Sequence, residues 1–279
     1  MQTPYVIFNG TLIPEREARL SVTDLAIVRG YGIFDFFKTV RGISLFVEDN
    51  LNRFYRSAEL MDLPIHYSKA ALNSLIGQLM TANNMPDSGI KLLLTGGYSP
   101  DGYSIADPNL IISQQPFTCD TKEEEQGLQL LPFDYHRPFS QVKSIDYVMG
   151  IQALKVAKKA GADDVVYVQN GLISECPRAN FFLVSPEGRL LTAGDDVLQG
   201  ITRMKILEIA KPYFEIEVRD ISVEDLNRAS EAFICSTTKN ITPVTSVLGY
   251  KDFGLGAGRV TKQLQQLLNS LIYSDGSYL

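Results

Sequence analysis

The sequence has few of the residues that most often bind metals or form disulfides. Its 279 residues include two histidines, three cysteines and no tryptophan. His66 and His136 lie far apart and have no cysteine at ligand spacing, and the cysteines form no Cys-x-x-Cys pair. We therefore expect no metal site. The cysteines are odd in number, which favours small buried apolar side chains over a disulfide framework (Cys119, Cys176 and Cys235).

Charge and hydropathy exclude further classes of protein. The formal net charge is -6, whereas a nucleic-acid binder normally carries a basic patch. No apolar run reaches the roughly 18 residues of a membrane span, and the first residues lack the pattern of a signal peptide. We expect a cytoplasmic protein without nucleic-acid or membrane partners. Neither Gly-x-Ser-x-Gly nor a P-loop occurs, so the chemistry is left to lysine, arginine and carboxylates, or to a bound cofactor.

The hydrophobic pattern predicts an α/β (α+β) protein with two domains. In the first half, Asn9-Gly10 between two apolar runs predicts a hairpin, and a strand should end at Val40. Helices should start near Asp49 and Ser68, followed by strands at 90–95 and 110–113. We expect a small N-terminal domain over 1–116, a polar linker over 117–127 and a larger domain over 128–279. A solvated loop inside one domain explains 117–127 nearly as well.

The second half of the sequence contains turn and helix signals of the same kinds. Hairpins are expected around Asn170-Gly171 and over 180–192. A helix over 151–160 should end at Gly161, and two more should start near Thr202 and Arg259. Strands and helices in mixed order favour two α/β-type domains over a repeat array.

Four short features carry candidate chemistry. Lys143 stands among apolar neighbours before a helix, where an amine loses its proton more easily. Residues 200–203 (Gly-Ile-Thr-Arg) lead into a helix, whose N-terminus attracts anions. A strand over 233–238 ends in three hydroxyl groups, and 174–180 holds a carboxylate and a guanidinium. Taken singly, each also fits a structural role: a surface lysine, an N-cap, a hydroxyl-rich turn and a salt-bridged hairpin.

Together these features resemble the class IV (fold type IV) pyridoxal-phosphate aminotransferases. That family includes D-amino acid and branched-chain aminotransferases and aminodeoxychorismate lyase. The resemblance covers nearly the whole chain, and its most specific pieces are Lys143-Ser144-Ile145, Glu175 with Asn180-Phe181-Phe182, Gly200-Ile201-Thr202-Arg203 and Ser236-Thr237-Thr238. It implies two domains with pyridoxal 5'-phosphate in the cleft between them, and a homodimer in which each site borrows a loop from the partner.

The resemblance also implies a role for each matching residue. Lys143 would form the Schiff base and move a proton at the substrate Cα, and Glu175 would keep the pyridine nitrogen protonated. Tyr147 would reach the cofactor's phenolic oxygen or Glu175, although packing on the helix explains it at least as well. The phosphate would be bound by Arg53, Ile201, Thr202, Ser236 and Thr237.

The substrate side departs from the family pattern. Phe34 stands where D-amino acid aminotransferases have a carboxylate-binding tyrosine, and Asp101 and Tyr103 replace their arginine and histidine. Because an aminotransferase must still bind a carboxylate, we expect Arg29 and Arg178 to form a substitute clamp. Two salt-bridged surface arginines are the equally weighted alternative.

We therefore expect an enzyme that transfers an amino group from an amino acid, favouring D-amino acids, to a 2-oxo acid. Both substrates are small molecules. The alternatives are a branched-chain L-amino acid aminotransferase, a lyase that releases pyruvate from aminodeoxychorismate, and a protein that only binds the cofactor. Retention of both Lys143 and Glu175 disfavours the last, since anchoring the phosphate requires neither.

Overall fold

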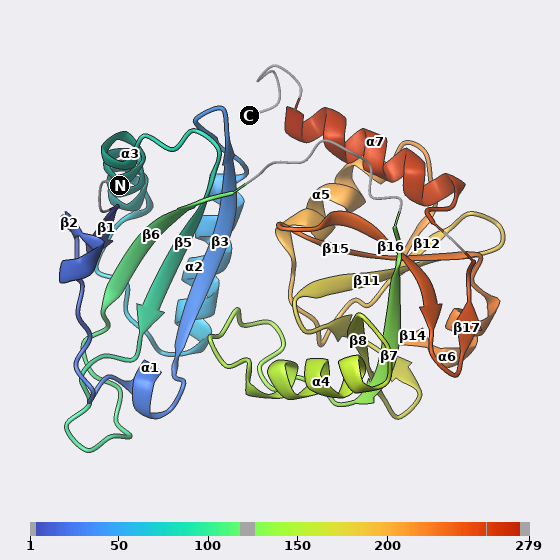
Figure 1. Cartoon of the computed structure of the whole chain (residues 1–279), viewed down its shortest axis with the longest axis horizontal. Helices are drawn as coiled ribbons and strands as arrows, with labels where there is room; N and C mark the ends of the chain where they lie inside the picture. The colour runs from blue at the N-terminus through green and yellow to red at the C-terminus, as the bar shows by residue number, and fades with distance from the viewer. Residues whose placement is uncertain (1–3, 118–125, 255, 274–279) are drawn as a thin grey trace. The chain divides into compact units, whose positions relative to one another are not determined.

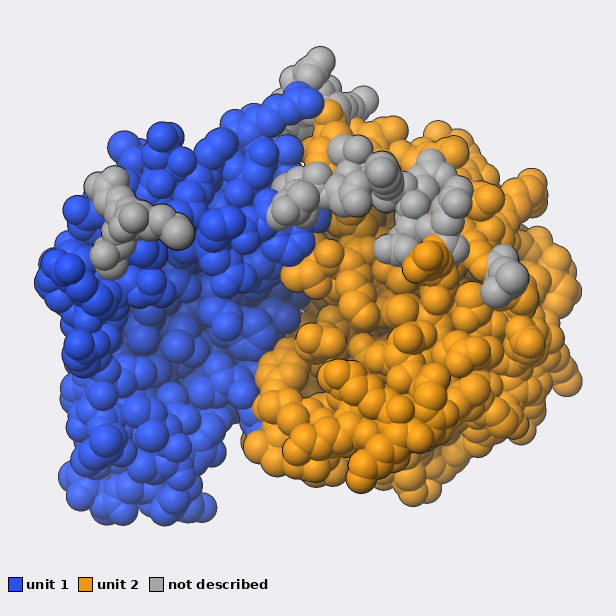
Figure 2. Space-filling model, in the orientation of Figure 1, with its two compact units in different colours: residues 1–120, 142–146, 279 blue, residues 121–141, 147–278 orange. Residues whose placement is uncertain are grey.

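The computed structural model describes residues 4–117, 126–254 and 256–273. Contacts divide the chain into two compact units, coloured separately in Figure 2. Unit 1 contains residues 1–120, 142–146 and 279, and unit 2 contains 121–141 and 147–278. The sequence predicted domains over 1–116 and 128–279, with Lys143 in the second; the contacts instead assign 142–146 to unit 1. Most of the predicted linker, residues 118–125, lies outside the described residues, as does Cys119.

Unit 1 is built on a six-stranded sheet in the order β2-β1-β6-β5-β3-β4, with antiparallel neighbours throughout. Helices α2 and α3 contact this sheet (Figure 1). Its strands are β1 (Tyr5–Phe8), β2 (Thr11–Pro14), β3 (Gly32–Val40), β4 (Ile43–Ser44), β5 (Ser88–Thr95) and β6 (Leu110–Pro116), and its helices are η1 (Glu15–Glu17), α1 (Leu25–Val28), α2 (Val47–Leu60) and α3 (Lys69–Asn83).

The sequence pattern explains this unit. The predicted hairpin, the strand ending at Val40 and both helices are confirmed, and Ser68 caps α3 by accepting from the Ala71 N–H. Alternate residues of β3, Ile33 and Phe37, enter the core, because successive side chains of a strand point to opposite faces. The core is completed from β5, α2 and α3 (Ile90, Leu92, Leu94, Leu51, Phe54, Leu72 and Leu79).

Unit 2 is built on a larger mixed sheet in the order β13-β12-β11-β15-β16-β7-β8-β9-β14, with β10 beside β11 and β17 beside β16. The β12–β13, β16–β7 and β7–β8 pairs are parallel. The strands are β7 (Leu128–Asp134), β8 (Asp164–Gln169), β9 (Leu172–Ile173), β10 (Glu175–Cys176), β11 (Ala179–Val184), β12 (Leu190–Thr192), β13 (Ile216–Val218), β14 (Ile221–Ser222), β15 (Glu231–Ser236), β16 (Asn240–Val247) and β17 (Lys251–Asp252). The helices are α4 (Val148–Lys159), α5 (Ile201–Ala210), α6 (Val223–Arg228) and α7 (Arg259–Tyr273).

The predicted hairpins and helices of this half are also confirmed. β8 and β9 pair around Asn170-Gly171, and β11 pairs with β12. Gly161 follows α4 at φ +79°, the left-handed conformation that favours glycine after a helix. Within the described part of the chain, no helix is long and apolar enough to cross a bilayer.

Candidate active site

Lys143 lies on a short extended segment that adds to the sheet of unit 1. Ser144 forms an antiparallel bridge with Ile33, the Phe34 N–H donates to the Lys143 carbonyl at 2.9 Å, and the Ile145 N–H donates to the Gly32 carbonyl at 3.0 Å. The neighbouring Val142 is buried in the unit 1 core. These bonds explain why residues 142–146 belong to unit 1 and not to unit 2. The segment pairs with one edge of β3, and β5 pairs with the other edge.

Opposed residues of an antiparallel pair point to the same face, so Lys143 and Phe34 share one face of the sheet. The Lys143 Nζ lies 4.6 Å from the Phe34 ring centroid, within the range of a cation–π contact. Phe34, which the sequence placed at the substrate, therefore contacts the lysine predicted to react.

Arg53 has a buried carboxylate partner in unit 1. Its Nε and one terminal nitrogen donate to the two oxygens of Asp35 at 2.9 and 2.8 Å, and both side chains are buried. This paired geometry orients the guanidinium. The phosphate-binding role of Arg53 stays a prediction.

Glu175 lies in unit 2, on β10, and is 4% exposed. Its Oε1 accepts from the Arg137 Nε at 3.0 Å, with a second Arg137 nitrogen at 2.9 Å. Its Oε2 accepts from the Leu198 N–H at 3.1 Å and from the Asn180 side-chain amide at 3.4 Å. These donors, one of them cationic, stabilise the carboxylate in its ionised form. A carboxylate must be ionised to keep a neighbouring pyridine nitrogen protonated.

The N-terminus of α5 has the properties of an anion site. Gly200 precedes it, and among the described residues no side chain caps its first N–H groups, which belong to Ile201 and its neighbours. A Cβ on Gly200 would lie 2.1 Å from the Asn180 Oδ1, so this close approach requires glycine. Thr202 stands in the first turn, half-buried, and adds a hydroxyl group.

The preceding loop, residues 193–199, is held by a buried arginine. Arg203 donates to the Ala193 carbonyl and to the Gln199 Oε1, both at 2.8 Å. Burial lowers the pKa of this guanidinium. Because Leu198 of the same loop donates to Glu175, Arg203 stabilises the backbone that holds the carboxylate.

Ser236 and Thr237 follow the buried part of β15 and lie at the same end of the sheet as Asn180. The register pairs Asn180 with Glu175 on one side and with Cys235 on the other. Asn180 also donates to the Leu198 carbonyl at 2.8 Å. Asn180 thus connects Glu175 with the loop before α5, and in the sheet it pairs with Cys235, the residue before Ser236.

The remaining predicted residues lie on the surfaces of the units. Tyr147 is half-buried at the start of α4, with its Cδ1 3.7 Å from the position of a Cβ on Gly150. Arg178, in unit 2, is exposed and lies 4.0 Å from the buried Asp164. Arg29, in unit 1, is exposed and donates to the Val28 carbonyl at 2.8 Å. The two arginines of the predicted clamp therefore belong to different units.

Sequence reasoning missed Arg137. It stands 38 residues before Glu175, in a loop with no motif of its own, so only the fold reveals the pair. Asn180 and Arg203 belong to motifs of the family resemblance, but nothing in those motifs indicates their hydrogen-bond partners.

The buried thiols of unit 2 do not have the environment of nucleophiles. Burial raises the pKa of Cys235 to about 12 and raises that of Cys176 as well. The prediction that they are small buried side chains is confirmed for these two cysteines.

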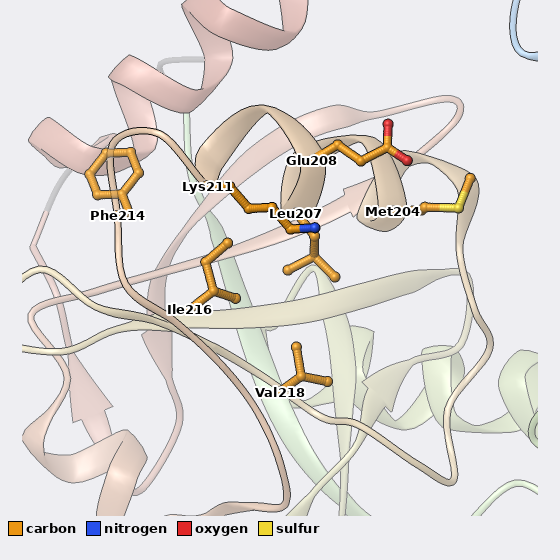
Figure 3. Close-up of a pocket in the computed structure, with 7 residues that line it drawn as sticks. All are labelled: Met204, Leu207, Glu208, Lys211, Phe214, Ile216 and Val218. Carbon is orange, nitrogen blue, oxygen red and sulfur yellow. The ribbon is translucent and has the colours of Figure 1, made fainter.

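Unit 2 also has a mostly apolar hollow of about 580 Å³ beside α5 and β13, shown in Figure 3. Its lining contains none of the predicted site residues (Met204, Leu207, Glu208, Lys211, Phe214, Ile216 and Val218). We assign it no part in the chemistry.

The donor set fits pyridoxal 5'-phosphate. The start of α5 without a side-chain cap and the hydroxyl group of Thr202 suit a phosphate, and the glycine at 200 leaves room for the Asn180 side chain beside that helix. An ionised glutamate suits a protonated pyridine nitrogen, and a lysine on an aromatic surface suits a covalent bond to an aldehyde.

Comparison with known proteins identifies the family. The family model for class IV amino-transferases matches residues 32–247. The chain is 28% identical to a D-alanine aminotransferase of Bacillus licheniformis, over 97% of this chain and 98% of the other. It is 26% identical to a putative branched-chain-amino-acid aminotransferase of Methanocaldococcus jannaschii, over 94% of each.

Solved structures show the same fold. The branched-chain amino acid aminotransferase of Escherichia coli superimposes with a TM-score of 0.87 at 26% identity, covering 95% of this chain and 93% of the other. The branched-chain amino acid aminotransferase of T.th., solved with pyridoxamine 5'-phosphate, superimposes with a TM-score of 0.89 at 22% identity, covering 98% and 95%. The predicted fold class, cofactor and reaction type are confirmed: the chain belongs to the class IV aminotransferases and is a pyridoxal-phosphate-dependent enzyme.

Proposed function

We propose that this enzyme transfers the amino group of a D-amino acid to a 2-oxo acid. The observation that carries the proposal is the full-length similarity to D-alanine aminotransferases, together with Lys143 and the Arg137-paired Glu175. A branched-chain L-amino acid aminotransferase is the second candidate, favoured by the structural match to the Escherichia coli enzyme.

The proposed site residues divide the work of binding the cofactor. Glu175 would hold the pyridine nitrogen in its protonated form, with Arg137 and the Leu198 N–H keeping the glutamate ionised. The phosphate would be bound at the start of α5 by Ile201 and Thr202 and at the end of β15 by Ser236 and Thr237. Arg53 would be a further donor. Tyr147 would hydrogen-bond the phenolic oxygen.

Lys143 would hold the cofactor covalently and, once released by the substrate, move a proton at the substrate Cα. When bound, the cofactor supplies an electron sink for the pair left at that carbon. The contact with the Phe34 ring restricts where the Lys143 Nζ lies. Arg29 and Arg178 would bind the α-carboxylate, since a guanidinium can donate to both carboxylate oxygens.

A donor screen tests the proposal. Purified protein loaded with pyridoxal phosphate is mixed with D-alanine, D-glutamate or L-leucine, and the cofactor absorbance near ~420 nm is followed. Loss of the band with D-amino acids, restored by a 2-oxo acid, supports the proposal. Loss of the band with L-leucine alone would favour the branched-chain aminotransferase over the D-amino acid aminotransferase. Release of pyruvate from aminodeoxychorismate without a 2-oxo acid acceptor would show that the enzyme is a lyase and not an aminotransferase.

The Lys143→Ala variant is the control for this screen. It should keep phosphate-dependent binding of the cofactor but lose the donor-induced spectral change, and borohydride should no longer fix the cofactor to residue 143. A full spectral change in this variant would contradict the role of Lys143.

We also propose a homodimer located in the cytoplasm. Residues 22–27 and 97–105 of unit 1 are joined by backbone hydrogen bonds, such as that of the Ser99 N–H to the Thr23 carbonyl at 3.2 Å. They expose several large apolar side chains (Val22, Ile27, Tyr98, Tyr103 and Ile105). Such a patch suits an interface between copies. Light scattering should give twice the mass of one chain, and fractionation of tagged cells should place the protein in the cytoplasm.

A further inference from the structure

One face of the unit 1 sheet combines aromatic and cationic side chains. The register opposes Phe34 to Leu93 and Phe36 to Lys91, so these side chains share the face of Lys143, opposite to the core face. The corresponding residues of β6 are Ile111 and Ser113, and no position of this face on β3, β5 or β6 carries an acidic residue. A face of this composition attracts anions.

Lys91 and Lys143 contact the same aromatic ring. The Lys91 Nζ lies 5.4 Å from the Phe34 centroid and the Lys143 Nζ lies 4.6 Å from it. The two lysines start from opposite flanks of β3, since β5 pairs along one edge and 143–145 along the other. Both ammonium groups therefore lie within cation–π range of one ring, and they are at most about 10 Å apart.

Lys91 is available for a ligand. Its side chain is exposed, and within the described part of the chain it makes no ion pair. Asp35, the acidic residue of β3, points to the opposite face and pairs with Arg53.

The separation of the two lysines fits a second carboxylate of the substrate. In an extended five-carbon diacid, the distal carboxylate lies about 5–6 Å from the nitrogen on C2, and a charged hydrogen bond adds about 2.8 Å. The total, about 8–9 Å, lies within the upper limit of about 10 Å on the distance between the ammonium groups. The α-carboxylate, about 3 Å from that nitrogen, reaches only about 6 Å with the same hydrogen bond.

We infer that Lys91 binds the distal carboxylate of a dicarboxylic substrate, an acidic amino acid or its 2-oxo acid, with the methylene groups lying over Phe34. This inference rests on the proposed function, because the substrate nitrogen is placed where the Lys143 Nζ acts. Lys91 is then a specificity-determining residue: it selects a diacid over a monoacid of similar length.

The test compares Lys91→Met and Lys91→Arg with Lys69→Met. Lys69 is a matched control, because it is an exposed lysine of unit 1 that lies over a different ring, that of Tyr55, at 5.6 Å. KM and kcat are measured for 2-oxoglutarate and for pyruvate. Binding of the unreactive acids glutarate and butyrate is measured by calorimetry on the cofactor-loaded enzyme.

Lys91→Met should lose about 10- to 100-fold in kcat/KM for 2-oxoglutarate and in glutarate affinity, with less than about a 2-fold change for pyruvate. Lys91→Arg should retain most of the kcat/KM for 2-oxoglutarate and most of the glutarate affinity. Lys69→Met should resemble the wild-type enzyme in both measurements. Equal losses for both acceptors, no loss for either, or a wild-type preference for pyruvate over 2-oxoglutarate would overturn the inference. If no amino acid changes the cofactor spectrum, the proposed function fails, while glutarate binding still tests Lys91 separately.

Discussion

The pair of Arg137 and Glu175 makes a quantitative prediction about stability. Both side chains are largely buried, at 18% and 6% exposure, and two guanidinium nitrogens lie 2.9 and 3.0 Å from the glutamate Oε1. Replacing Arg137 with methionine leaves a buried carboxylate without its cation. Breaking a buried pair in this way costs about 3–5 kcal/mol of unfolding free energy. Part of that cost comes from the bonds that Arg137 also donates to the Ser140 and Phe139 carbonyls.

A double-mutant cycle separates the two contributions. Urea unfolding is measured on the cofactor-free protein, so that ligand binding adds no stability. The variants are Arg137→Met, Glu175→Gln and the double variant. We expect a coupling energy of about 2–3 kcal/mol, because hydrogen bonds between charged groups account for most of the loss.

Arg189→Met is the matched control. Arg189 is about half exposed and pairs with the exposed Glu215 at 2.8 Å, and such surface pairs contribute less than about 1 kcal/mol. An Arg137→Met cost equal to that of the control, or additive single variants, would refute the conclusion that Arg137 stabilises the ionised glutamate.

Two further predictions concern unit 2. Gly200→Ala should lower the unfolding free energy by about 1–3 kcal/mol, because the new Cβ would lie 2.1 Å from the Asn180 side chain. Gly194→Ala is the control, because the nearest atom to its new Cβ is 3.4 Å away. In the same urea assay it should lower the unfolding free energy clearly less. Hydrogen bonds from Arg219 hold the pKa of Asp225 well below its usual 3.8. The resulting stability is present above that pH and is lost as pH falls through the folded-state pKa. Asp225→Asn should therefore cost about 1 kcal/mol at pH 7, and this cost should fall steadily as the pH is lowered from about 5 to about 2; a cost that stays constant over this range would contradict this.

The local pattern of the sequence was sufficient for most elements. Asn9-Gly10 and Asn170-Gly171 formed the hairpins that their turn chemistry predicts, and Ser68 and Gly161 bounded helices as expected. These signals depend on backbone dihedrals and on capping, which involve residues close in the chain. The resemblance to the family likewise depended on contiguous motifs, and it led to the reaction type and the cofactor.

What the sequence did not reveal depends on contacts between distant segments. Nothing near Lys143 shows that its segment extends the sheet of unit 1, because the partner strand β3 lies more than 100 residues away in the chain. Arg137 was invisible for the same reason, since its partner is reached only through the β7, β8 and β10 arrangement.

The sequence by itself determined the turns, the helix limits, the family and the residues that could react, because each is encoded over a few adjacent positions. The tertiary structure decided which charges meet: Arg53 with Asp35, Arg137 with Glu175, and Lys91 with Lys143 over one ring. Those pairings follow from the strand register and from the packing of a helix and a loop against the sheets, which bring residues from separate segments within a few ångströms of each other.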